Sequence, residues 1–149
     1  MTPNASWDKV LKLLHEEQFG VLGTTRAGHA YTSLVAFATS ADDRDLYFAT
    51  TRATRKYHNL ATDARVAFLI DNRGRQSLPL YEAAAVTAYG QANELTAEER
   101  PSAMQHYLAR HPQLKSFVTA PTTALFCIRV DSYHLVERFQ HVTEFRIDR

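Results

Sequence analysis

The first apolar residues of the chain recur at helical spacing. Four of them lie three or four positions apart: Trp7, Val10, Leu11 and Leu14. This spacing places them on one face of a helix. Ser6 stands directly before them, and a serine hydroxyl can accept a hydrogen bond from the free N–H groups at a helix start. We therefore predict an amphipathic helix over residues 6–17 that is capped by Ser6.

After this helix the pattern changes to short runs of β-branched and aromatic residues separated by polar turns, which is typical of strands. The predicted strands cover residues 19–25, 30–39, 46–50, 65–71 and 82–94, and two more lie within 122–139 on either side of Asp131-Ser132. Gly28 falls in the first turn, where we expect a positive φ. Because most of the turns are short, neighbouring strands are expected to pair antiparallel.

Helical signals return in two later segments. A short helix is predicted for residues 54–61, beginning at Thr54. Thr96 and Glu99 have the spacing of a capping box, so another helix is expected to begin there, with one more turn at 114–118. Its apolar face carries Met104, Tyr107 and Leu108. Seven strands and three helices predict a mainly β fold, a β-barrel with peripheral helices that forms one domain over residues 1–149.

Composition narrows the possible partners. The 149 residues include 17 Lys and Arg against 16 Asp and Glu, a net charge of +1 that provides no broad basic field for nucleic acid. Apolar runs such as 83–86 are too short to span a bilayer, and the N-terminus lacks the pattern of a secretory signal. A single cysteine, Cys127, excludes an internal disulfide. We therefore expect a cytoplasmic protein that binds neither membrane nor nucleic acid.

One segment combines hydroxyl groups with positive charge. Thr50 and Thr51 end a predicted strand, and Thr54, Arg55 and Lys56 begin the next helix. A helix start attracts anions, whereas cations there are unfavourable unless an anion is bound. The segment is thus either a phosphate-binding cradle or an ordinary surface helix whose cations face water. The local pattern does not decide between them, because a misplaced surface charge costs only about 0.3–1 kcal/mol.

The order of elements resembles the pyridoxamine 5′-phosphate oxidase-like family of FMN-binding split barrels. The likeness covers residues 19–139 and is most specific within 48–70. The matching motifs are Thr54-Arg55-Lys56, Asn59-Leu60, Arg65-Val66-Ala67 and Val86-Thr87-Ala88-Tyr89-Gly90. The resemblance implies FMN as cofactor and a homodimer with the flavin at its two-fold interface.

The resemblance also assigns roles by position. The hydroxyl and Arg-Lys group of the family holds the FMN phosphate, and here it corresponds to Thr50, Thr51, Thr54, Arg55 and Lys56. The preceding strand of the family lies along the ribityl chain and the flavin ring, and it corresponds to Ser33, Leu34 and Val35. These eight residues are the expected cofactor site.

Two departures from the vitamin B6 oxidases limit the prediction. Their second strand carries an arginine and a lysine that are absent from residues 32–37, and their C-terminal substrate motif is absent from residues 138–146. We therefore do not expect vitamin B6 oxidation. The main hypothesis is a flavoprotein oxidoreductase with a small-molecule substrate and NADH, NADPH or another reductant. The alternative is a non-catalytic module that holds FMN, haem or a deazaflavin, and the near-neutral charge disfavours a third, a nucleic-acid-binding barrel.

Other polar residues are further candidates for a site. The basic loop 72–77 either folds over a flavin of the partner subunit or is solvated. His141 either approaches a flavin or haem or lies on the surface. His106 and His111 lack the spacing and partners of a zinc site, so we expect no metal. Ser33 has no Gly-x-Ser-x-Gly setting, so hydrolase chemistry is not expected.

Overall fold

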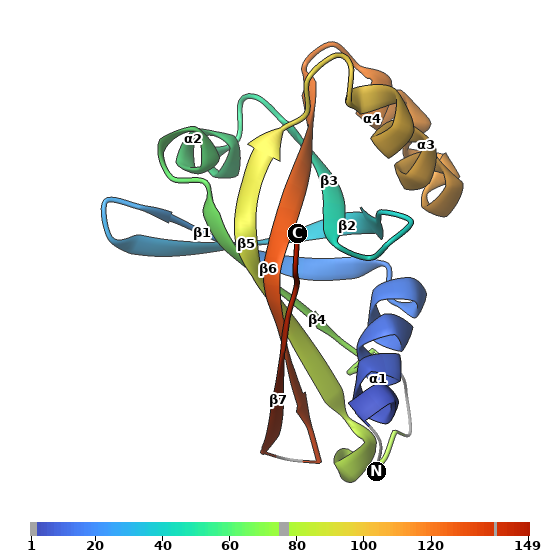
Figure 1. Cartoon of the computed structure of the whole chain (residues 1–149). Helices are drawn as coiled ribbons and strands as arrows, with labels where there is room; N and C mark the ends of the chain where they lie inside the picture. Colours follow the sequence, from blue (N-terminus) through green and yellow to red (C-terminus); the bar gives the residue numbers. More distant parts are fainter. Residues whose placement is uncertain (1–2, 75–77, 139) are drawn as a thin grey trace.

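In the computed structural model, which describes residues 3–74, 78–138 and 140–149, seven strands form one antiparallel sheet (Figure 1). The strands are β1 (Phe19–Arg26), β2 (His29–Thr39), β3 (Asp45–Thr51), β4 (Arg65–Asp71), β5 (Ala84–Glu94), β6 (Thr123–Glu137) and β7 (His141–Arg146). Their order is β3-β2-β1-β4-β5-β6-β7, and a pairing of β3 with β6 closes the first six strands into a barrel. The predicted antiparallel β-barrel is confirmed.

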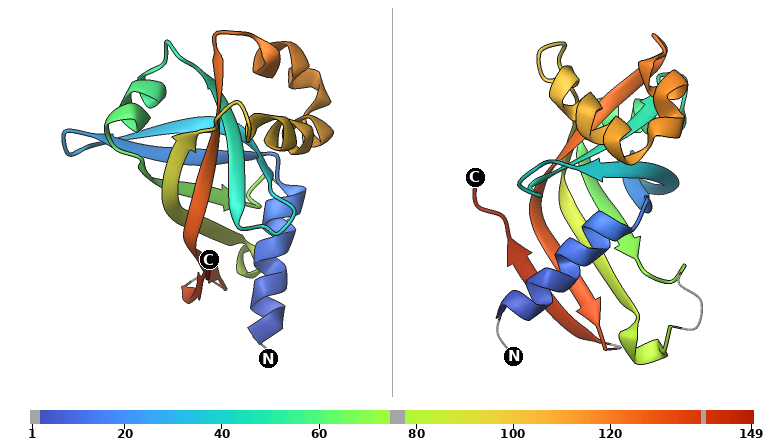
Figure 2. Two further views of the ribbon diagram at one scale, coloured as in Figure 1. Left: turned by 45° about the horizontal axis from the view of Figure 1, so that its top comes forward. Right: turned by 90° about the vertical axis from the view of Figure 1, so that its right-hand side faces the viewer.

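The helices lie around the barrel. They are α1 (Pro3–Glu16), α2 (Arg55–Thr62), α3 (Arg100–Arg110) and α4 (Lys115–Thr119), with 3-10 turns η1 (Leu80–Glu82) and η2 (Pro112–Leu114). Figure 2 shows α1 along one side of the barrel and α3 packed beside α4 near one end. Within the described ranges, no helix is long and apolar enough to cross a membrane.

The first helix begins earlier than predicted, and Ser6 is not its cap. Ser6 lies inside α1, is buried, and donates a hydrogen bond to Glu137 Oε2 at 3.2 Å. Lys9, one turn later, also donates to the Glu137 carboxylate. The hydroxyl that suggested a helix start therefore serves a tertiary contact between α1 and the end of β6.

The core has two parts. Inside the barrel the Phe48 and Phe126 rings stack with centroids 5.3 Å apart, and α1 covers this cluster with Val10 and Leu14. A second cluster lies between β3, β6 and the helices α3 and α4, and Tyr107 is buried at its centre. The residues of the predicted α3 face, Met104, Tyr107 and Leu108, all belong to the second cluster. The two hydrogen bonds of the predicted capping box form, since Thr96 N donates to Glu99 Oε1 at 3.1 Å and Glu99 N donates to Thr96 Oγ1 at 3.2 Å. They close a turn, however, and α3 begins only at Arg100, later than predicted.

The prediction that a turn at Asp131-Ser132 separates two strands is wrong. β6 runs through both residues, and the polar pair marks a β-bulge: Ser132 pairs with Tyr89 and Val130 with Gly90, so Asp131 has no partner on β5. The backbones approach closely here, because a Cβ on Gly90 would lie 2.1 Å from Arg129 O. The seventh strand is instead β7, which was not predicted, while Phe139 lies outside the described residues.

Candidate functional site

The barrel wall is open between β2 and β3. These strands pair over only three positions: Phe37 with Phe48, Ala38 with Tyr47 and Thr39 with Leu46. Among the described strands, the part of β2 before Phe37 pairs only with β1, and the part of β3 after Phe48 pairs only with β6. In the described chain, β2 therefore has one edge without a strand partner along residues 30–36. This opening, which we call the split, has Ser33, Leu34 and Val35 on one side and Thr50 on the other.

The backbone of β2 directs polar groups into the split. Phe37 N donates to Gln18 O on the β1 side at 3.2 Å. Successive residues of a strand direct their N–H and C=O groups to opposite sides, so Ala36, Leu34 and Thr32 direct theirs to the open edge. Ala36 O accepts a hydrogen bond from the Tyr107 hydroxyl at 3.4 Å. The peptide groups of Leu34 and Thr32 thus line the split as a row of donors and acceptors.

The side chains of the predicted β2 residues do not share one face. Val35 is buried and Ser33 half-buried, both on the inward face of the sheet, whereas Leu34 points outward and is 69% exposed. Tyr31 shares the inward face with Ser33 and Val35. The sequence prediction missed Tyr31, although its two-residue spacing from Ser33 could have indicated the shared face.

Two threonines shape the turn on the other side of the split. Thr54 is the N-cap of α2 and accepts from Tyr57 N at 3.3 Å, so the helix begins at Arg55, one residue later than predicted. The hydroxyl of buried Thr50 lies 2.8 Å from that of Thr54, which donates to Thr51 O at 3.0 Å. Thr50 and Thr54 are thus brought together, while Thr51 contributes its carbonyl. The first N–H groups of α2 have no carbonyl acceptor within the helix, and Tyr57 N uses the Thr54 hydroxyl instead.

The two cations at the start of α2 have no ion-pair partner among the residues that the structure describes. Arg55 is exposed, and its guanidinium carbon lies 5.1 Å from the centroid of the Tyr31 ring. Lys56 is half-buried, and this burial lowers the pKa of its amine. None of the ion pairs among the described residues involves either side chain, whereas nearby Arg52 pairs with Glu94 at 2.5 Å. An anion is the natural partner for this positive group.

Asn59 fastens α2 to the barrel. It is completely buried, and its Nδ2 donates to Thr24 Oγ1 on β1 at 3.1 Å. Its Oδ1 has no hydrogen-bond partner among the described groups. In the sequence Asn59 stands out only as part of a motif, and the structure gives it a physical role. It fixes the middle of α2 against β1, the strand that also supports the split.

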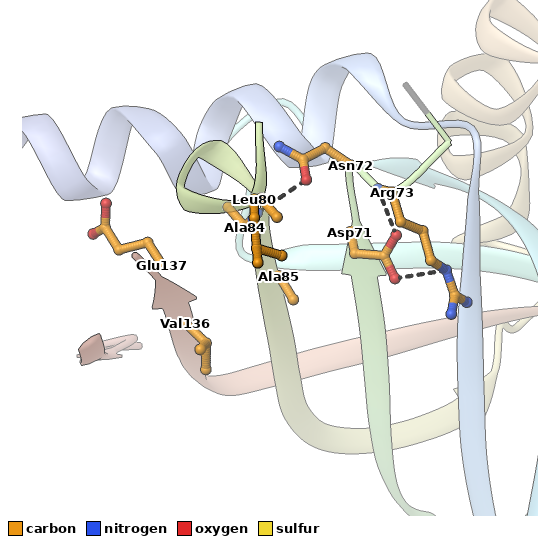
Figure 3. Close-up of a pocket in the computed structure, with 9 residues that line it drawn as sticks. Asp71, Asn72, Arg73, Leu80, Ala84, Ala85, Val136 and Glu137 are labelled. Carbon is orange, nitrogen blue, oxygen red and sulfur yellow. Dashed lines mark hydrogen bonds and ion pairs between the residues drawn. The ribbon is translucent and has the colours of Figure 1, made fainter. Parts of the chain in front are cut away.

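Three cavities of the described structure lie away from the split. One of about 320 Å³ is lined by the ends of β4, β5 and β6 (Figure 3). A second of about 540 Å³ adjoins it beside α1, and a third of about 250 Å³ lies between α2 and the end of β5. None of these three cavities is lined by the residues expected to hold the cofactor.

Two further sequence candidates lie at the end of the barrel away from α2 (Figure 1). In the basic loop, Asn72 Oδ1 accepts from Ala84 N at 2.9 Å and Arg73 pairs with Asp71 at 3.1 Å, as Figure 3 shows. Residues 75–77 of this loop lie outside the described part. His141 begins β7 and is exposed. Neither the described loop nor His141 approaches the split of its own chain.

Comparison with known families gives one match over most of the chain. A family model described as pyridoxamine 5′-phosphate oxidase matches residues 6–137. Among curated proteins, no sequence matches this chain. The matched segment contains the split, α2 and all eight expected site residues.

Solved structures share the fold at low sequence identity. A heme binding protein from Mycobacterium smegmatis superposes with a TM-score of 0.85 at 20% identity, covering 98% of this chain and 59% of that one. A Clostridium acetobutylicum protein related to general stress protein 26, of the pyridoxinephosphate oxidase family, gives 0.76 at 13% identity, with 99% and 98% covered. An FAD-binding protein from Mesorhizobium loti gives 0.69 at 16% identity, with 91% and 94% covered. The chain thus spans little more than half of the first of these proteins.

Proposed function

This chain belongs to the pyridoxamine 5′-phosphate oxidase family, and on that premise we propose that it binds FMN in the split between β2 and β3. The observation that carries the proposal is Lys56, a half-buried cation beside Arg55 at the start of α2, with no carboxylate partner among the described residues. Structures of this fold include proteins described as FAD-binding and heme-binding, so the barrel is a cofactor-binding module.

The residues of the split fit the parts of FMN. A phosphate carries about two negative charges, which match the cations of Arg55 and Lys56. The free N–H groups and the dipole of α2 add to the attraction. Arg can bind two phosphate oxygens at once, and Lys supplies a compact charge. Thr50 and Thr54 shape the turn that presents these groups.

The strand on the other side of the split suits the ring. A flavin ring has hydrogen-bonding atoms along its edge, and the peptide groups of Leu34 and Thr32 present alternating donors and acceptors to the open edge of β2. Ser33 and Val35 line the inward side. The donor set therefore fits a phosphate-bearing flavin along its whole length.

When bound, the flavin supplies hydride or electron transfer, and we propose an oxidoreductase with a small-molecule substrate and a nicotinamide reductant. The chain needs no nucleophile, acid or base for such chemistry. Its own residues neutralise the phosphate through Arg55 and Lys56, orient the ring through the Leu34 peptide, and exclude water on the inward side through Val35. Substrate and reductant then approach from the open side of the split.

We further propose a homodimer that completes the site. The outward face of the sheet carries exposed or half-exposed apolar side chains, in which Val21 lies opposite both Leu34 and Leu69, and Val136 lies opposite Val142. We call these side chains, together with Phe19 and Tyr89, the outer apolar face. Patches of this kind mark protein interfaces. Because Leu34 belongs to both the outer apolar face and the edge of the split, a partner bound there would enclose the flavin.

The absorbance spectrum of the purified protein tests the proposal. We expect a flavin spectrum after reconstitution with FMN, tighter binding of FMN than of riboflavin, and reduction of the bound flavin by NADH or NADPH. A protein that binds FMN but is not reduced would be a carrier. Binding of haem with a Soret band, and of no flavin, would instead support the haem-binding module suggested by the Mycobacterium smegmatis structure.

A further inference from the structure

We infer that Glu94 is a positioning residue for the phosphate site, and this inference rests on the function proposed above. Glu94 is the last residue of β5, outside the segment that carries the cations. Its Oε2 accepts from Arg52 Nη2 at 2.5 Å, and its Oε1 accepts from the Tyr57 hydroxyl at 3.3 Å. One carboxylate therefore joins the residues on both sides of the Thr54-Arg55-Lys56 segment.

The Arg52 side of this connection is anchored twice more. Arg52 Nη1 donates to Pro121 O at 2.9 Å, and Arg52 N donates to Thr122 O at 3.0 Å. The β3–α2 turn is thus fastened to the segment that leads into β6, while Glu94 fastens it to β5. These contacts fix where α2 begins, and so where its N–H groups and its two cations point.

Packing alone does not fix α2 on the β5 side. The cavity of about 250 Å³ between α2 and the end of β5 is lined by Tyr57, Leu60, Ala61, Ala92, Asn93, Glu94 and Phe126. Tyr57 still packs edge-on against the Phe126 ring, with centroids 5.8 Å apart, and Leu60 is buried in the barrel core, so apolar packing holds only part of this side of the helix. The Tyr57–Glu94 hydrogen bond spans the same gap. Glu94 therefore adds a directional polar contact to the packing that positions α2 against β5.

Glu94 pairs with only one of the three cations near the start of α2. Arg52, Arg55 and Lys56 lie within five residues of one another, yet only Arg52 has a carboxylate partner in the described chain. If Glu94 served only to balance charge, its neutralisation would free the Arg52 guanidinium and strengthen phosphate binding. If Glu94 positions α2, the same change weakens phosphate binding. The two roles predict opposite signs, so binding measurements can separate them.

The test compares FMN and riboflavin affinities of wild type, Glu94→Gln and Tyr57→Phe. We expect Glu94→Gln to weaken FMN binding by about tenfold, as is common for residues that orient binding groups, and to leave riboflavin binding nearly unchanged. Tyr57→Phe removes one contact without a charge change, and we expect a smaller loss of the same kind. Because the Arg52–Glu94 pair is partly exposed, the variants are expected to fold.

Asp71→Asn is the matched control, since Asp71 also ends a strand and pairs with an arginine, but at the end of the barrel away from α2. It should leave both affinities unchanged. FMN affinity that is unchanged or higher in Glu94→Gln would overturn the inference, as would equal weakening of both ligands. If Arg55→Ala weakens FMN binding while Glu94→Gln does not, this inference alone fails. A wild-type protein that binds no FMN overturns both proposals.

Discussion

The ring of Tyr31 on β2 lies beneath the guanidinium of Arg55 at the start of α2, with 5.1 Å between the guanidinium carbon and the ring centroid. This cation–π contact connects the two sides of the split. At an exposed site such a contact contributes about 0.5–1 kcal/mol, enough to favour one position of a long side chain. Arg55 is thereby held near the β2 edge, while no carboxylate of the described segments pairs with its charge.

Removing the two cations should release the cofactor. Each charge-assisted hydrogen bond contributes about 1.5–3 kcal/mol, so Arg55→Ala combined with Lys56→Ala should weaken FMN binding by about a hundredfold or more. Fluorescence titration of the apoprotein measures this loss. Arg65→Ala is the control, because Arg65 lies just beyond the other end of α2 and pairs with Asp63. Retained FMN affinity in the double variant would contradict the placement of the phosphate.

The FMN affinity should depend on pH between neutral and alkaline values. Burial lowers the pKa of the Lys56 amine, and a bound phosphate favours its protonated form. FMN affinity should therefore be highest below this lowered pKa and fall as pH rises through it, whereas riboflavin affinity should not change there. Titrations of both ligands from neutral to alkaline pH measure the difference. Lys56→Arg should abolish the pH dependence, because a guanidinium keeps its charge.

A charge on the outer apolar face should separate the subunits. Leu34 is 69% exposed on this face, and Leu34→Lys would place an unpaired ammonium in the proposed interface. We expect a monomer by light scattering and weaker FMN binding. Leu80→Lys is the matched control, since Leu80 is 66% exposed on η1, outside that face. A wild-type monomer, or a Leu34→Lys dimer of unchanged affinity, would argue against the interface.

Gly90 should be required for stability rather than for binding. A Cβ at this position would lie 2.1 Å from Arg129 O, too close for van der Waals contact. Gly90→Ala must displace β6 at the bulge, and we expect a loss of about 1–3 kcal/mol in the free energy of unfolding. Gly74→Ala meets no atom within 4 Å and should be nearly neutral. Chemical denaturation compares the two, and equal effects would contradict the close approach.

The contact between α1 and β6 should weaken in acid. Burial by itself raises the pKa of Glu137. The hydrogen bond and charge of Lys9 and the hydrogen bond of the Ser6 hydroxyl lower this pKa by more than burial raises it, so the net shift is downward. A lowered pKa in the folded state stabilises the fold above the unfolded-state pKa, and this stabilisation disappears as pH falls through the folded-state value. Glu137→Gln should therefore cost about 1–3 kcal/mol at neutral pH, and less as the pH falls. Chemical denaturation of wild type and Glu137→Gln at several acidic pH values measures how the difference in their free energies of unfolding shrinks. A difference that stays constant with pH would contradict the prediction.

Much of the fold followed from local patterns. The strand Arg65–Asp71 was predicted at its observed bounds, and Gly28 has the expected positive φ of 80°. The short helix predicted for residues 54–61 forms as α2, with its start and end each one residue later. These features depend on side-chain periodicity, turn chemistry and the first turn of a helix, which residues close together in sequence determine. For the same reason the cation pair at the start of α2 is evident from the amino-acid sequence.

Contacts between distant residues could not be found in this way. Ser6 was predicted to cap a helix, but it bonds to Glu137 on another element. Asp131 and Ser132 have the composition of a turn, yet a bulge opposite Gly90 lets β6 continue through them. In both cases the polar character of the residue is plain in the sequence, and a partner far along the chain decides its role.

The sequence by itself determined the first five strands, the family likeness and the charged helix start, because each is encoded within a short stretch of chain. Only the tertiary structure decided that β2 and β3 separate after three pairs, that Tyr31 lies under Arg55, and that Glu94 pairs with Arg52 while Lys56 has no such partner among the described residues. The physical reason is that these relationships depend on which strand edges meet and in what register. That choice is made by the packing of the whole barrel and by no single segment.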